Sequence, residues 1–96
     1  GGEIPEDIEE VTVSAGDEGI ALANIIKTAG LTQSTSDAHR MVKQGAVKID
    51  GEKVENSRQT LKAGVSFTLQ VGKRRFAQII LTWDTWIPQK LSLNTR

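Results

Sequence analysis

The stretch STSDAHRMVKQGAVKIDG, residues 34–51, changes its hydrophobic period halfway along and so decides the fold class. Ser34 stands three residues before Asp37, which is the spacing of a helix capping box and predicts that a helix begins here. Gly45 predicts the end of that helix, because a glycine tolerates the positive φ that a helix terminus needs. The helix between them carries a narrow apolar stripe of Ala38, Met41 and Val42.

Beyond this helix the apolar residues recur at every second position, which is the period of a half-buried strand. Val47 and Ile49 alternate with Lys48, and Asp50-Gly51 is a signal for a type I′ hairpin turn. The other expected strands are residues 53–54, 65–71 and 76–81.

A first helix is predicted upstream, over residues 20–29, from apolar residues at helical spacing. Asp17 or Ser14 is expected to cap its start and Gly30 to end it. Residues 55–63 are expected to form a polar connection. The order is then helix, helix and about four antiparallel strands, an α+β pattern in which a two-helix hairpin packs on a small sheet.

Length and composition exclude several classes of protein. Ninety-six residues allow one compact domain, and the lack of Cys excludes a disulfide scaffold, a thiolate zinc site and a Cys nucleophile. His39 is the single histidine and forms no catalytic motif, so we predict no catalytic residue, no cofactor and no metal site. No membrane association is expected, because no apolar run approaches the roughly 18–20 residues that span a bilayer, and the acidic start does not resemble a signal peptide.

The net charge of zero conceals an uneven distribution of acidic and basic residues along the chain. Residues 1–18 hold seven acidic residues and no basic one, whereas residues 19–96 hold all twelve basic residues and five acidic ones. We interpret residues 1–16 as an acidic linker or tag remnant, 17–82 as the folded domain and 83–96 as a C-terminal tail. Within the linker, Ile8, Val11 and Val13 could form a short strand. A basic body suggests a polyanionic partner; an ordinary solvated surface is the alternative.

The basic residues supply the candidate site. Arg40 and Lys43 are three apart and share a helix face. If this helix packs beside the sheet, they converge with the basic turn after Gly72 on one concave, phosphate-binding patch. Few aromatics lie among them, so we expect recognition of the backbone shape of a structured RNA. The predicted RNA contacts are Ser34, Thr35, Ser36, His39, Arg40, Lys43, Lys48, Lys73, Arg74 and Arg75.

Trp83 and Trp86 stand in the predicted tail, where Pro88 argues against a central strand. We expect both Trp side chains to fold back over the sheet. Stacking on bases and contact with another domain or protein are the alternatives.

Three runs of the sequence, residues 22–31, 34–42 and 44–51, resemble the S-four RNA-binding (alpha-L) fold, which is named after a small-subunit ribosomal protein. The runs KQGAVKIDGEKV, residues 43–54, and LQVGKRRFA, residues 69–77, resemble the C-terminal domain of bacterial-type tyrosyl-tRNA synthetases. The resemblance covers about residues 17–82. Many members of the fold have basic residues where this chain has Thr35 and His39. Two positive charges of the second helix are therefore missing or weakened in this chain.

The resemblance implies a non-catalytic domain that grips tyrosine tRNA near its long variable arm and anticodon stem. It implies a catalytic body, in the full-length protein, that makes tyrosyl-adenylate and transfers tyrosine to tRNA. It also implies a place in the bacterial cytoplasm or, alternatively, the mitochondrial matrix. A free-standing S-four-fold protein that binds ribosomal or other structured RNA is the alternative function. A second alternative is that the chain is the guide domain of an RNA-modifying enzyme.

Overall fold

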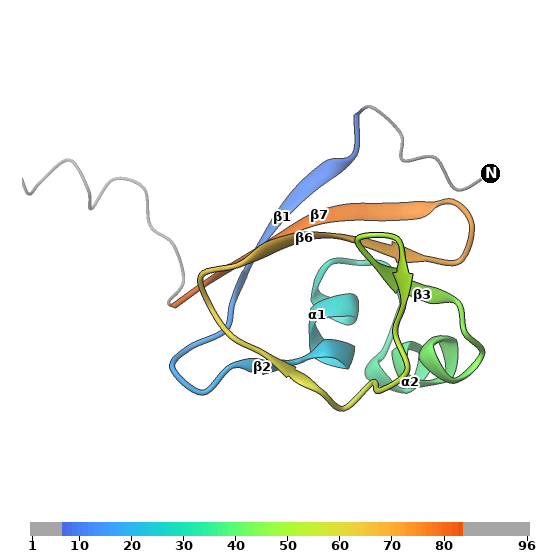
Figure 1. The fold of residues 1–96 in the computed structure, drawn as a ribbon, viewed down its shortest axis with the longest axis horizontal. Coiled ribbons are helices and arrows are strands. Elements are labelled where there is room, and N and C mark those ends of the chain that lie inside the picture. The colour runs from blue at the N-terminus through green and yellow to red at the C-terminus, as the bar shows by residue number, and fades with distance from the viewer. Residues whose placement is uncertain (1–6, 84–96) are drawn as a thin grey trace, which may run out of the picture.

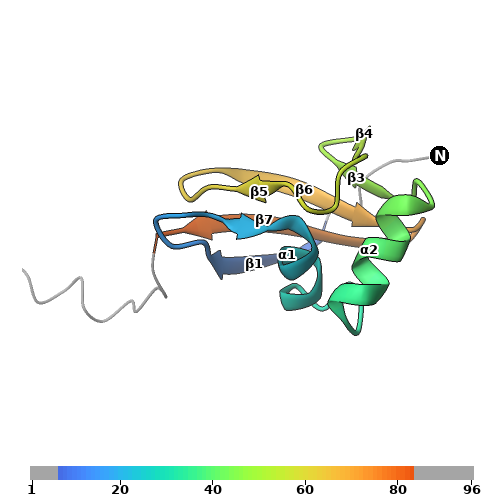
Figure 2. The same cartoon turned by 90° about the horizontal axis from the view of Figure 1, so that it is seen from below.

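A five-stranded sheet with the strand order β1-β7-β6-β3-β4 forms the frame of the molecule, and both helices lie on one side of it (Figures 1 and 2). The computed structural model describes residues 7–83. A separate two-stranded ladder pairs β2 with β5. In chain order the elements are β1 Glu9–Ser14, β2 Ile20–Ala21, α1 Leu22–Thr28, α2 Thr35–Lys43, β3 Val47–Ile49, β4 Glu52–Lys53, β5 Thr60–Leu61, β6 Ser66–Val71 and β7 Arg75–Thr82.

Four strands of the large sheet are those expected from the alternating sequence. β4, β3, β6 and β7 are joined by antiparallel pairing, so the α+β class is confirmed. The β3–β4 hairpin turns at Asp50 and Gly51, whose φ angles are 51° and 87°. Positive φ at both central positions is the property of a type I′ turn that Asp-Gly predicts.

The fifth strand, β1, was expected to belong to the linker. It pairs with β7 in parallel, from Glu9 opposite Ala77 to Ser14 opposite Thr82, so the sheet is mixed rather than antiparallel. Val13 is only 3% exposed and belongs to the core. These residues therefore form the short strand that the sequence left open, and its parallel pairing with β7 could not be anticipated because the partner strand lies far away in sequence. Residues 1–6 of the predicted linker and the tail from residue 84 lie outside the described residues.

The first helix is shorter than its periodicity indicates. It begins at Leu22, and its N-cap residue Ala21 makes no side-chain capping bond, so the predicted caps are wrong. Ile20 and Ala21 instead pair with β5 inside the segment expected to be an irregular connection. Gly19 permits this approach, because a Cβ built on it would stand 2.5 Å from Thr60 Cγ2.

Both helices end as the glycines predict. The Gly30 N–H donates to the Lys27 carbonyl at 2.9 Å and the Leu31 N–H to the Ile26 carbonyl at 3.1 Å. These two bonds form a Schellman motif, which satisfies carbonyls that a helix end leaves free. The same pair of bonds recurs at Gly45, so each helix stops at its predicted residue.

The start of α2 has the predicted N-cap residue, Ser34. The Ser34 Oγ accepts the backbone N–H of Asp37 at 3.1 Å. The Asp37 carboxylate does not complete a capping box, since it forms an ion pair with Arg40 one turn later.

Ser34→Ala should lower the free energy of unfolding by about 0.5–2 kcal/mol, because it leaves one N–H of the first helical turn without its acceptor. Urea unfolding followed by far-ultraviolet circular dichroism measures the change. Ser36→Ala, at an exposed position of the same turn, is the matched control. Equal effects of the two substitutions would contradict a capping role for Ser34.

The core fills the space between the sheet and the helices. Its largest fully buried side chains come from α1, β3, β6 and β7: Leu22, Ile25, Ile26, Val47, Leu69, Ile79 and Leu81. Trp83 does not join this core. It is 60% exposed, and its ring lies over Gly64, where a Cβ would stand 3.0 Å from it. Trp86 lies outside the described residues, so its expected position stays a prediction.

Candidate nucleic-acid interface

The turn between β6 and β7 carries the most concentrated positive charge of the folded part. Val71 pairs with Arg75 across the ladder, which leaves Gly72, Lys73 and Arg74 in the turn itself. The Gly72 N–H donates to the Ala46 carbonyl at 2.8 Å. This bond fixes the turn beside the residues that follow α2, so two segments distant in sequence meet there.

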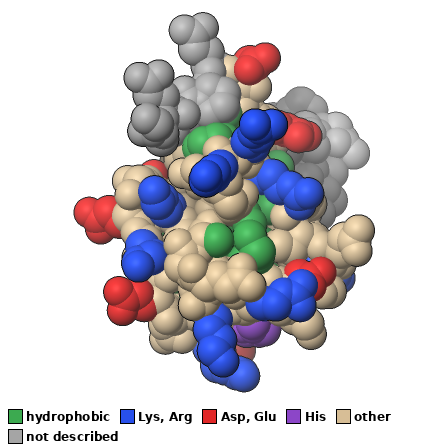
Figure 3. Space-filling model, turned by 90° about the vertical axis from the view of Figure 1, so that its right-hand side faces the viewer, with side chains coloured by type: hydrophobic (Ala, Val, Ile, Leu, Met, Phe, Trp, Pro, Cys, Tyr) green, Lys and Arg blue, Asp and Glu red, His purple; other side chains and the backbone are tan. Residues whose placement is uncertain are grey.

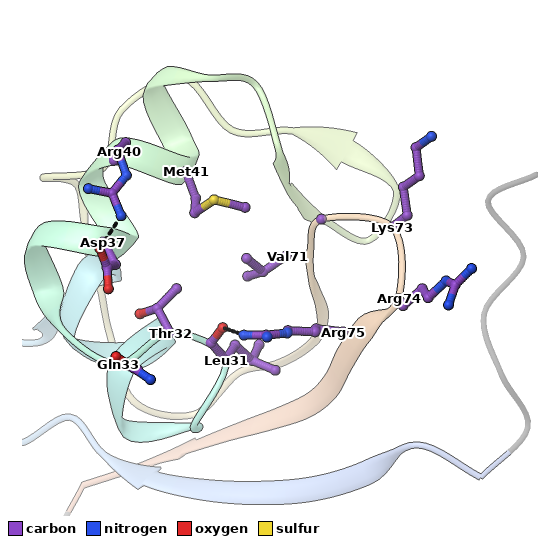
Figure 4. A pocket seen from close by; sticks show the side chains of 11 residues that line it. Leu31, Thr32, Gln33, Asp37, Arg40, Met41, Val71, Lys73, Arg74 and Arg75 are labelled. Atoms are coloured by element: carbon purple, nitrogen blue, oxygen red, sulfur yellow. Dashed lines mark hydrogen bonds and ion pairs between the residues drawn. The ribbon is translucent and has the colours of Figure 1, made fainter.

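A hollow of about 550 Å³ opens between this turn, the α1–α2 loop and α2 (Figure 4). Met41 and Val71 form its apolar floor, and polar and charged side chains surround them. Its full lining is Leu31, Thr32, Gln33, Asp37, Arg40, Met41, Val71, Gly72, Lys73, Arg74 and Arg75. We call it the first hollow.

The four cations of the first hollow are not equivalent. The Arg75 Nη1 donates to the Leu31 carbonyl at 2.9 Å, which ties β7 to the α1–α2 loop. Arg40 is paired with Asp37. Figure 4 shows Lys73 and Arg74 pointing away from these two pairs, and both side chains are exposed. Neither has a hydrogen bond or ion pair with any residue of the described range 7–83, so they are the cations most available to a phosphate.

A second hollow, of about 640 Å³, lies on the other side of the same turn. Lys73 and Arg74 line both hollows and form the ridge between them. The lining of the second hollow is Gln44, Gly45, Ala46, Lys48, Gln70, Gly72, Lys73 and Arg74. Figure 3 shows Lys and Arg side chains across this end of the molecule around a small apolar area, with acidic side chains mostly toward its edges.

The structure thus divides the predicted single patch. Arg40 and Arg75 line the first hollow, Lys48 lines the second, and Lys73 and Arg74 line both. His39 points to a different neighbour, because its Nδ1 lies 2.5 Å from the Ser57 Oγ. The remaining predicted contacts line neither hollow: Ser34, Thr35, Ser36 and Lys43. Arg40 and Lys43 are separated because three residues rotate a helix by 300°, which leaves a 60° offset.

Two residues of this surface were not predicted from the sequence. Gln70 lies opposite Lys48 in the β3–β6 pair and lines the second hollow. Lys53 lies opposite Lys48 in the β3–β4 hairpin, and its Cδ comes within 3.3 Å of where a Cβ on Gly45 would stand. The Asp50-Gly51 turn already implied the Lys48–Lys53 pairing, but Gln70 depended on the register of a distant strand.

Other kinds of site are missing from the described part of the chain. Residues 7–83 contain no group of three or more His, Asp or Glu side chains that could hold a metal ion. None of the helices in this range is long and apolar enough to cross a membrane.

Comparison with known proteins adds the family. Residues 3–78 match the model of the tyrosine–tRNA ligase SYY-like C-terminal domain. The tyrosine–tRNA ligase of Shewanella oneidensis is 60% identical over 80 residues, which are 83% of this chain and 20% of the relative. That of Idiomarina loihiensis is 56% identical over 79 residues, which are 82% of this chain and 20% of the relative. The chain spans about one fifth of the length of these relatives, and it belongs to the family of tyrosine–tRNA ligase SYY-like C-terminal domains.

Proposed function

We propose that this domain binds tyrosine tRNA through its phosphate backbone and so supports tRNA tyrosylation by a catalytic body in the full-length synthetase. The observation that carries the proposal is the exposed Lys73–Arg74 ridge between two cation-lined hollows. Arginine can hold a phosphate with two parallel hydrogen bonds, and lysine supplies a point charge. The domain itself carries out no chemistry in this proposal.

The family and the arrangement of elements support an S-four-like fold for the domain. In that proposal the α1–α2 pair and the β6–β7 turn together present the RNA-binding surface. The mixed sheet adds the parallel strand β1, which was not expected, on the side of β7 away from β6. This addition leaves the surface formed by α2, β3 and the turn unobstructed by β1.

The surface favours recognition of backbone shape. Among the lining residues of the two hollows only Lys48, Lys73 and Arg74 carry a positive charge and have no polar partner within residues 7–83. Three to five phosphate contacts would give a slope of about −3 to −5 in a plot of log affinity against log salt concentration. Such a domain binds weakly alone, and a catalytic body on the same chain would raise its effective affinity. We place the full-length protein in the bacterial cytoplasm.

A nuclear magnetic resonance titration tests the proposal. The domain is titrated with tyrosine tRNA and, separately, with a tRNA that lacks a long variable arm, each at two salt concentrations. We expect shifts at residues 40–48 and 72–75 that weaken at high salt and are larger with tyrosine tRNA. Equal shifts with both RNAs would support the alternative of a general binder of structured RNA. A folded sample without shifts would contradict RNA binding.

A further inference from the structure

The sheet face opposite the helices carries a row of side chains of which the proposed phosphate contacts use only Lys48. Lys53 on β4 pairs with Lys48 on β3, Lys48 pairs with Gln70 on β6, and Gln70 pairs with Phe76 on β7. Directly paired residues project on the same side of a sheet. With strands about 4.8 Å apart, the row from Lys53 to Phe76 spans about 15 Å.

Phe76 lies on the outer face of β7. Burial alternates along this strand, with Ala77, Ile79 and Leu81 buried and Phe76 half-buried. Half-buried apolar side chains that pack against the core come from other positions, such as Met41 and Ile49, and Phe76 is not among them. An aromatic ring on the outer sheet face, beside a cation-lined hollow, can stack against a nucleotide base.

The charge on this face is polarised across the strands. Lys48 and Lys53 stand at the β3–β4 end, and the Lys73–Arg74 ridge borders the same corner. At the other edge Glu10 of β1 is paired with Gln78 of β7. A polyanion on the outer face is therefore attracted to the corner formed by β3, β6 and the turn, and repelled from β1.

The polar groups of the row suit a nucleotide. The Gln70 side-chain N–H donates to the Gly72 carbonyl at 3.0 Å, which leaves the Gln70 side-chain oxygen to accept from a base or a ribose hydroxyl. In the neighbouring row the polar side chains already bond to each other, because the Thr68 Oγ1 donates a hydrogen bond to Gln78 Oε1 at 2.8 Å. Binding is therefore favoured at the row that contains Phe76.

We propose that the second hollow and this row form a subsite for an unpaired RNA nucleotide. Its base stacks on Phe76, and the adjoining phosphates contact Lys48 and Lys53, about two and three strands away. The proposal deepens the proposed function and rests on it. It assigns to the sheet face a preference for unpaired nucleotides that backbone contacts at the turn do not supply.

The test uses two RNA hairpins of equal stem length, one fully paired and one with a single bulged 2-aminopurine nucleotide. Fluorescence anisotropy gives the affinity of the domain for each, and quenching of 2-aminopurine reports stacking. We expect about fivefold or more tighter binding of the bulged hairpin, with quenching. Phe76→Leu should abolish the preference and the quenching while the affinity for the paired hairpin stays unchanged.

Matched variants separate this site from general electrostatics. Replacing Lys48 and Lys53 together by glutamine should lower the affinity of the domain for the bulged hairpin more than its affinity for the paired one. Lys27→Gln with Lys62→Gln removes the same charge at exposed positions outside both hollows and should lower both affinities equally. Val65→Ala, which trims an apolar side chain that is 48% exposed, should leave the preference intact. Thermal unfolding confirms that each variant is folded.

The outcomes distinguish the inference from the proposed function. Equal binding of both hairpins by the wild-type domain, or an unchanged preference in Phe76→Leu, would overturn the subsite and leave the proposed function standing. Failure to bind either hairpin or tyrosine tRNA would overturn the proposed function and the subsite together.

Discussion

Replacing Lys73 and Arg74 together by alanine should lower the affinity of the domain for tyrosine tRNA by about tenfold at low salt and flatten its log–log salt slope by about 2. These side chains form the ridge between the two hollows and have no polar partner within residues 7–83. They are exposed, so their removal costs little folding stability. Fluorescence anisotropy over a series of salt concentrations measures both quantities.

The control for this pair removes equal charge elsewhere. Lys27 and Lys62 line neither hollow, so replacing both by alanine should change the affinity for tyrosine tRNA far less than the ridge variant does. If the two double variants weaken binding equally, net charge rather than the ridge governs the interaction, and the site is wrong. Arg75 is unsuitable for this comparison, because its bond to the Leu31 carbonyl gives it a structural role.

Replacing Leu69 by alanine should lower the free energy of unfolding by about 2–5 kcal/mol. Leu69 is 0% exposed and lies on β6, between β7 and β3, where its pairing partners are Ala77 and Ile49. Removing its side chain leaves a cavity in the middle of the sheet that its neighbours cannot fill without moving. Small domains have a total stability of about 5–15 kcal/mol, so this loss is a large share of the total.

Urea unfolding followed by circular dichroism measures the Leu69→Ala effect. Val65→Ala is the matched control, because Val65 precedes the same strand and is 48% exposed. It should change the free energy of unfolding by no more than about 0.5 kcal/mol. A Leu69 effect as small as that of Val65 would contradict the position of β6 in the core.

The RNA contacts themselves stay a prediction, but the sequence could anticipate the grouping of cations only where it depends on one element, and not where it depends on how elements face each other. The turn of Lys73 and Arg74 was evident because its residues are consecutive. His39 and Lys43 were grouped with Arg40 because they share a helix. The packing of α2 turns them in different directions, and His39 faces Ser57 instead of a hollow. Gln70 and Phe76 became candidates only once the register of β6 and β7 placed them beside Lys48.

Local interactions explain what the sequence by itself determined. A cap at Ser34, glycines at both helix ends and a two-residue turn at Asp50 all act within a few residues of chain. The alternation of apolar residues likewise decides which side of a strand is buried. These features therefore suffice to predict the two helices, four strands of the large sheet and the α+β class without tertiary contacts.

Only the tertiary structure decided the pairings between distant segments. β1 joins β7 in parallel across most of the chain, and β2 joins β5 across α1 and α2. Arg75 reaches Leu31, and Gly72 reaches Ala46, through bonds that no sequence spacing encodes. Such contacts form because the helices and the sheet bury a shared core, and that packing sets which cations meet around each hollow. The charges belong to the sequence, whereas their division between two hollows belongs to the fold.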